Sequence, residues 1–111
     1  MPRFTVTGHY TPSAMKAMIE NPSDREAAAR GLAEAAGGTL ESVYLTTGDQ
    51  DFAIKVMIDD ISGLLAGLLA TGASGTVCNL RTMRAVTSDA FTEIQKKAGG
   101  IAAAYRTPGG R

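Results

Sequence analysis

The apolar residues of this chain change their spacing from every second residue to every third or fourth residue and back, twice over. Alternation over residues 3–10, 40–47, 51–58 and 76–86 predicts strands with one buried face. Helical spacing over residues 13–20, 23–36, 61–72 and 88–97 predicts four helices. The order of these elements predicts a four-stranded antiparallel sheet in the strand order 4-1-3-2. Right-handed crossovers place both crossover helices on one face, and the last helix follows the sheet.

Short polar and glycine signals fix where the predicted elements begin and end. Thr11 before Pro12 predicts the cap of the first helix, and Ser23 with Glu26 forms a capping box that opens the second. Gly48-Asp49 predicts a hairpin turn between the second and third strands. The acidic pair Asp59-Asp60 lies where the start of a helix favours negative charge.

The length of 111 residues predicts one domain, which we place at residues 1–98. Residues 99–111 are predicted to form an extension, with a short helix in the alanine run and a frayed tail over the last five residues. Neither a leader peptide nor a membrane span is visible, and we expect a cytoplasmic protein with a reduced Cys78.

Composition excludes several functional classes. The 11 basic residues balance the 11 acidic residues, which disfavours a general nucleic-acid or membrane binder. One cysteine and one histidine make no internal disulfide and supply too few ligands for a common zinc site. We therefore expect no metal and no resident cofactor, and a buried apolar role for Cys78 is more plausible than a catalytic one.

Several short motifs resemble those of a known family in order and spacing. They are Tyr10-Thr11, Arg25-Glu26-Ala27-Ala28, Gly37-Gly38, Gly48-Asp49-Gln50-Asp51 and Leu80-Arg81-Thr82. On these residues the chain resembles the GYD-domain family from Arg3 to about Lys97. Gln50 stands where the family run Gly-Tyr-Asp has its tyrosine, so a role of that tyrosine does not carry over, whereas Asp51 matches.

The resemblance implies a ferredoxin-like α+β fold of the dimeric α/β-barrel type. It also implies a homodimer or a larger homo-oligomer joined through the open face of the sheet. The wider superfamily includes cofactor-free monooxygenases, isomerases and haem-degrading enzymes, which is an analogy of fold.

The predicted topology gathers polar residues at one end of the sheet and along its open face. The residues expected at that end are His9, Tyr10, Thr46, Asp51, Cys78 and Asn79. Those expected on the open face are Thr5, Thr7, His9, Tyr44, Lys55 and Met57. Closed by a second subunit, this face predicts a pocket for a small aromatic or enolisable molecule.

One hypothesis is a cofactor-free enzyme in which His9 acts as the general acid or base. Asp51 would orient His9, and Tyr44 or Lys55 would stabilise a developing oxyanion. The predicted ligand contacts are Tyr10, Thr7, Lys55, Asn79 and Arg25. Arg25 belongs to this set because a cation near a helix start is unfavourable unless it meets an anion.

The alternatives stay open at this point. His9 could be a surface residue at a strand end, Asp51 a turn residue and Lys55 a solvated charge. The protein could be a non-catalytic module that binds a ligand or only assembles, which the small number of ionisable groups favours. Haem binding through His9 is a third hypothesis.

Overall fold

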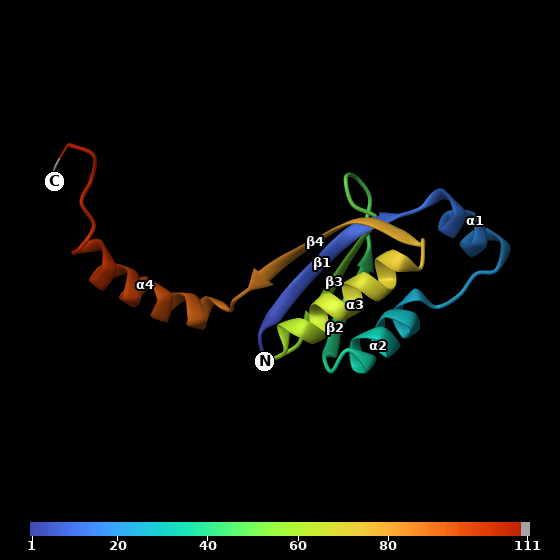
Figure 1. Ribbon diagram of the computed structural model, residues 1–111, viewed down its shortest axis with the longest axis horizontal. Helices are drawn as coiled ribbons and strands as arrows, with labels where there is room; N and C mark the ends of the chain where they lie inside the picture. Colours follow the sequence, from blue (N-terminus) through green and yellow to red (C-terminus); the bar gives the residue numbers. More distant parts are fainter. Residues whose placement is uncertain (110–111) are drawn as a thin grey trace.

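The computed structural model describes residues 1–109 and contains a four-stranded antiparallel sheet flanked by helices (Figure 1). In chain order the elements are β1 (Arg3–Tyr10), α1 (Pro12–Glu20), α2 (Arg25–Ala35), β2 (Thr39–Leu45), β3 (Phe52–Met57), α3 (Ile61–Ala73), β4 (Val77–Ala85) and α4 (Ser88–Ala102). The strand order β2-β3-β1-β4, read from β4, is the predicted order 4-1-3-2. The fold is ferredoxin-like, as predicted.

The crossover helices α2 and α3 both lie against one face of the sheet, which confirms that prediction (Figure 1). Alternate residues of β1 and β3 supply the core on this side because period-two patterning sends them to the same face. The buried cluster consists of Val6, Phe52, Val56, Ile58, Leu64 and Val77. Apolar residues of α2, β4 and both ends of β1 pack around it. The other face of the sheet is left open by α2 and α3.

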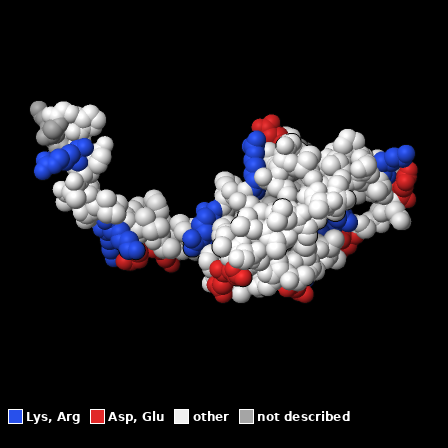
Figure 2. All heavy atoms as spheres, viewed as in Figure 1, with Lys and Arg blue, Asp and Glu red and all other residues white. Residues whose placement is uncertain are grey.

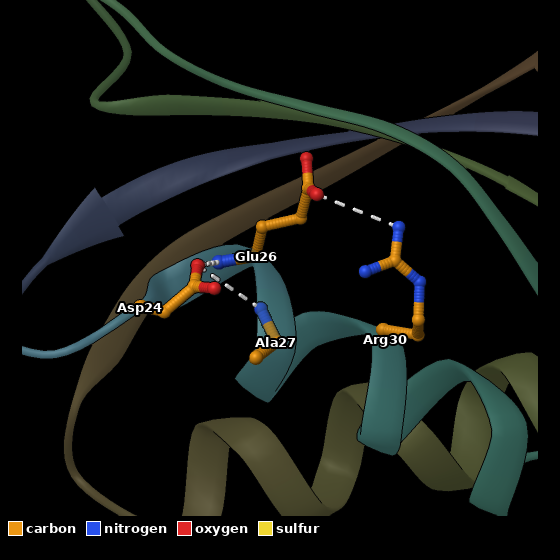
Figure 3. Close-up of polar contacts among 4 residues, drawn as sticks. All are labelled: Asp24, Glu26, Ala27 and Arg30. Carbon is orange, nitrogen blue, oxygen red and sulfur yellow. Dashed lines mark hydrogen bonds and ion pairs between the residues drawn. The ribbon is translucent and has the colours of Figure 1, made fainter.

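Helix caps account for where three of the helices begin. The side chain of Thr11 accepts from the Ala14 amide to cap α1, and that of Asp60 accepts from the Ser62 amide to cap α3. The predicted capping box at Ser23 is wrong by one residue. Asp24 is the cap of α2, because its carboxylate accepts from the amides of both Glu26 and Ala27, as Figure 3 shows.

The last helix differs from its prediction and stands apart from the rest. It does not end at Lys97, and the two glycines do not separate it from a second short helix; α4 runs through Gly99 and Gly100 to Ala102. It continues outward from the end of β4 and covers neither face of the sheet (Figure 1). Of the predicted frayed tail at 107–111, residues 110 and 111 lie outside the described residues.

Candidate functional site

The open face of the sheet carries the residues that the sequence placed there. Thr5 lies opposite Lys55, and Thr7 lies opposite Ala53, which in turn pairs with Tyr44. Directly opposed residues of antiparallel strands share a face, so these side chains lie on one surface. The side chains of Tyr44 and Lys55 are exposed there.

At the end of this face, the His9 side chain contacts both the β2–β3 hairpin and a bulge in β4. The register between β1 and β4 shifts after Thr7, so that Asn79 and Leu80 together lie opposite Gly8. Asn79 has a φ of 52°, a left-handed conformation that asparagine tolerates better than most residues. Its side-chain nitrogen lies 3.1 Å from Nδ1 of His9, while Nε2 of His9 hydrogen-bonds the carbonyl oxygen of Asp49 in the β2–β3 hairpin.

These two contacts define one arrangement of protons on the His9 ring. The amide nitrogen of Asn79 can only donate and the carbonyl oxygen of Asp49 can only accept, so the neutral ring carries its proton on Nε2. His9 as a general base stays a prediction; what the structure places there is a brace between the hairpin and β4.

Asp51 holds the end of β1. Its carboxylate accepts a hydrogen bond from the Tyr10 amide at 2.9 Å, and its own amide donates to the Gly8 carbonyl at 2.9 Å. The prediction that Asp51 orients His9 is therefore wrong: among residues 1–109, the ring partners of His9 are Asp49 and Asn79. Asp51 instead positions the residue on the other side of the strand, Tyr10.

Tyr10 turns toward the helices, where it meets the core. Its ring lies 5.2 Å from that of Phe52, centroid to centroid. Thr11 fixes the chain beyond it, with its amide donating to the Thr76 carbonyl and its hydroxyl to the Gly75 carbonyl. These contacts tie the end of β1 to the start of β4.

A cavity of about 160 Å³ lies between the sheet and the helices α2 and α3, with Tyr10 at one end. Its lining is mostly apolar, and the polar residues among the lining are Tyr10, Arg25, Thr71 and Thr76. The predicted pocket on the open face depends on a second subunit and stays a prediction; this cavity lies on the opposite, helix-covered face. Of the eight predicted site residues, Tyr10 and Arg25 line it, and the other six do not: Thr7, His9, Tyr44, Asp51, Lys55 and Asn79.

The space arises from small side chains on α2. Its inward face carries Ala28, Ala29 and Ala33, followed by Ala36 at the cap, and these side chains reach less far toward the sheet than leucine or isoleucine. Gly67 does the same on α3. The spacing of the alanines was the sequence signal that could have predicted the cavity. Thr71 and Thr76 were missed because nothing in the sequence indicates that their side chains face it.

Arg25 stands where this cavity meets a second, larger one. The second cavity, about 380 Å³, is bounded by α1 and the segment after it and shares Tyr10, Arg25 and Thr76 with the first. One terminal nitrogen of Arg25 donates to the Ser23 hydroxyl at 3.2 Å. Its Nε atom is buried and has no hydrogen-bond partner among the described residues.

The other charges at the start of α2 are already engaged. Figure 3 shows Asp24 turned to the backbone of its own helix and Glu26 paired with Arg30 at 3.5 Å. Arg25 thus brings a cation with an unused donor to a mostly apolar cavity. That combination can hold a negative charge on an otherwise apolar molecule.

The described residues hold no group of three or more histidine, cysteine or acidic side chains placed to bind a metal ion. No helix within residues 1–109 is both long and apolar enough to cross a bilayer.

Solved structures with the same fold are distant in sequence. A transcriptional regulator from Neisseria meningitidis, solved as an L-Met complex, is 16% identical over 78% of this chain and 51% of its own, with a TM-score of 0.55. MtbAldR is 12% identical over 78% of this chain and 52% of its own, with a TM-score of 0.53. The chain thus spans about half the length of these two proteins. TTHA0845 from Thermus thermophilus is 20% identical over 79% of this chain and 96% of its own, with a TM-score of 0.50.

Likeness at these identities shows the fold alone. The curated proteins compared with the chain include none that matches it. The model of the GYD domain, in contrast, matches residues 4–95, which include all of the sheet except Arg3, the residues that line the cavity, and Arg25. The chain therefore belongs to the GYD-domain family.

Proposed function

We propose that this protein binds a small organic acid in the cavity between the sheet and helices α2 and α3. The apolar body of the ligand occupies the space of about 160 Å³, and its carboxylate meets Arg25. A cavity of roughly 150 Å³ with an apolar lining is large enough for one benzene ring. The size thus favours a single aromatic ring or a branched aliphatic group.

The buried Nε of Arg25, which lacks a partner among residues 1–109, carries the proposal. A buried donor without a partner costs about 1–3 kcal/mol, and more when the group is charged. A carboxylate that reaches the guanidinium removes this cost and adds a charge-assisted hydrogen bond. Tyr10 and Thr76 line the same junction of the two cavities and supply polar groups beside it.

The fold relatives are compatible with a ligand of this kind. The Neisseria regulator was solved with L-methionine, a carboxylate with an apolar side chain. We carry over from it only the chemical class, an apolar acid.

The proposal favours binding over catalysis by the predicted residues. His9 is held by two partners, and neither His9 nor Tyr44 nor Lys55 lines the cavity. Of the predicted site residues, Tyr10 and Arg25 line it, and Asp51 positions Tyr10. The homodimer through the open sheet face stays a prediction.

Titration of the ¹⁵N-labelled protein with benzoate, followed by amide chemical shifts, tests the proposal. We expect saturable shifts that concentrate in α2, in α3 and at Tyr10 and Thr76. Shifts concentrated on the open face, around Lys55 and Tyr44, would place the site where the sequence first put it and contradict the proposal.

A cavity-filling variant with a matched control makes the test independent of shift mapping. Ala29 lines the cavity, so Ala29→Leu is expected to abolish saturable benzoate binding while the protein stays folded. Ala35→Leu is the control, because Ala35 lies exposed on the same helix. Equal binding by the two variants would remove the cavity from consideration.

A further inference from the structure

The helix α3 is apolar on its outer side as well as on its inner side. No charged residue occurs between Ile61 and Ala73, and only Leu64 is buried. Ile61, Leu65 and Leu69 are spaced four residues apart and are 54%, 55% and 74% exposed. We call these three residues the α3 stripe. A helix that is apolar all round is normally buried, so this stripe requires a cover.

The helix α4 carries a second apolar stripe, which does not pack on the rest of its own chain. Phe91, Ile94 and Ile101 follow one another at intervals of three and seven residues, which keeps them on one side of the helix, and Tyr105 follows just beyond its end. We call these the α4 stripe. All four are exposed, and α4 takes no part in the principal contacts between the described elements. In Figure 2 the charges of α4 gather along one edge of the helix.

The link from β4 directs α4 away from the α3 stripe of its own chain. Only Val86 and Thr87 separate β4 from α4, and Thr87 is extended, with φ −74° and ψ 163°. The helix therefore continues outward from the strand, and the molecule extends 63 Å along its long axis against 30 and 22 Å across (Figure 1). An outward arm reaches another molecule more readily than it reaches its own α3.

We propose that the α4 stripe of one copy packs on the α3 stripe of a second copy, in a reciprocal pair. The two helices have 13 and 15 residues, or about 20 Å each at 1.5 Å per residue, so their stripes match in length. Phe91 and Tyr105 each bring roughly 150–250 Å² when fully buried. Two-fold symmetry doubles the area that these rings bury. With the area of the aliphatic residues added, the total approaches the roughly 1,600 Å² of a standard interface.

Charge favours one orientation of the docked helix. Asp59 lies at the start of α3, next to the cap residue Asp60, and Lys97 lies in the second half of α4, next to Lys96, which pairs with Glu93. Antiparallel packing brings these opposite charges toward each other. It also opposes the two helix dipoles, which is the favourable arrangement.

Pairing of two α4 helices with each other is the weaker alternative. The α4 stripe covers two heptads, whereas a coiled coil usually needs three or four. Such a pair also leaves the α3 stripe uncovered.

Sedimentation velocity of two variants and their mixture tests the proposal. The α4 variant carries Ile94→Lys and Ile101→Lys, and the α3 variant carries Leu65→Glu and Leu69→Glu. Each variant alone should lose the association step, with an association constant about 100-fold or more below that of the unmodified chain. Ile19→Lys is the control, since Ile19 is 81% exposed on α1, and it should associate normally.

The mixture gives the decisive readout. One unmodified α3–α4 contact is possible between the two variants, and the second contact sets lysines against glutamates. Association should therefore return on mixing. Failure of the α3 variant to change association, or no recovery in the mixture, overturns the proposal in favour of α4 pairing or the open sheet face. A chain that is monomeric at every concentration overturns it as well.

A cross-link covers the case in which a charged variant does not fold. In a Cys78→Ser background, Ile61→Cys protein is mixed with Ile101→Cys protein under mild oxidation, because antiparallel packing places the start of α3 beside the end of α4. A disulfide between the two chains is expected, with little cross-linking in either sample alone. Equal cross-linking of Ile101→Cys with itself contradicts the proposal.

Discussion

The layer between the sheet and its two long helices is filled differently at its two ends. At the end where α2 finishes and α3 begins, Ile58 is only 2% exposed, and a Cβ on Gly63 would collide with the Ala36 carbonyl oxygen. At the other end, the loose end, Tyr10 and Arg25 border the cavity, whose lining extends along the layer as far as Ala36, Ile58 and Leu64. The closest packing of α2 on α3 thus lies at one end of the layer, the tight end, and the polar groups of the candidate site lie at the other.

The largest effect on stability is expected at the tight end. Ile58→Ala removes a fully buried side chain and should lower the free energy of unfolding by about 2–5 kcal/mol. Ile61→Ala is the control, because Ile61 is 54% exposed and should cost far less in the monomer. Urea unfolding measures both. Similar losses for the two would mean that the ends do not differ in this way.

The close approach of the helices gives the next largest effect. Gly63→Ala forces a Cβ against the backbone of Ala36 and should destabilise the protein by about 1–3 kcal/mol. Gly72→Ala, on the same helix, meets nothing within 4 Å and should stabilise the protein by up to about 1 kcal/mol. Thermal unfolding should show opposite signs. Two shifts of the same sign would contradict a tight contact at Gly63.

The brace at the loose end contributes less. Asn79→Ala removes the amide that contacts His9 and leaves an alanine in the left-handed region, for a loss of about 1 kcal/mol. Asn79→Gly keeps the conformation without strain and should cost about half as much or less. Equal losses for the two variants would mean that the contact with His9, which both lack, matters more than the left-handed conformation.

Arg25→Met should have the smallest effect on stability, within about 0.5 kcal/mol of zero. It removes a buried donor that has no partner among the described residues, which is a gain, and it also removes the hydrogen bond to the Ser23 hydroxyl, which is a loss, so the two changes largely cancel. Methionine keeps an apolar stem beside the cavity. Chemical unfolding measures the change. A loss above about 2 kcal/mol would mean that Arg25 holds the fold together and that the loose end is structural.

The main elements of the fold were predictable because each has a local cause. Alternation gave the four strands, and the strand order followed from handedness. Thr11 caps α1 as predicted, and Asp60, from the acidic pair expected at a helix start, caps α3. Asp24 replaced Ser23 as the cap of α2 because its carboxylate reaches two backbone amides. Gly99 and Gly100 did not end a helix, since a glycine ends one only where it takes a left-handed conformation, and neither does.

The site was less predictable, because it depends on contacts across the layer. The sequence placed His9, Asn79, Tyr10 and Asp51 at one end of the sheet, and their hydrogen bonds confirm this. It paired His9 with Asp51 because the bulge at Asn79, which brings the amide to His9, has no signature in the pattern. The cavity depends on how far the alanines of α2 stay from the sheet, which is a property of two elements together.

The ratio of affinities for benzoate and benzamide, at neutral pH, tests the account most directly, because the two probes share size and shape and differ in charge. The unmodified protein should prefer benzoate by about 10-fold or more, as a charge-assisted hydrogen bond predicts. Arg30→Met, on the same helix but paired with Glu26, should keep this preference, and Arg25→Met should lose it. A preference that survives Arg25→Met, or is absent from the unmodified protein, would contradict an anion site at Arg25.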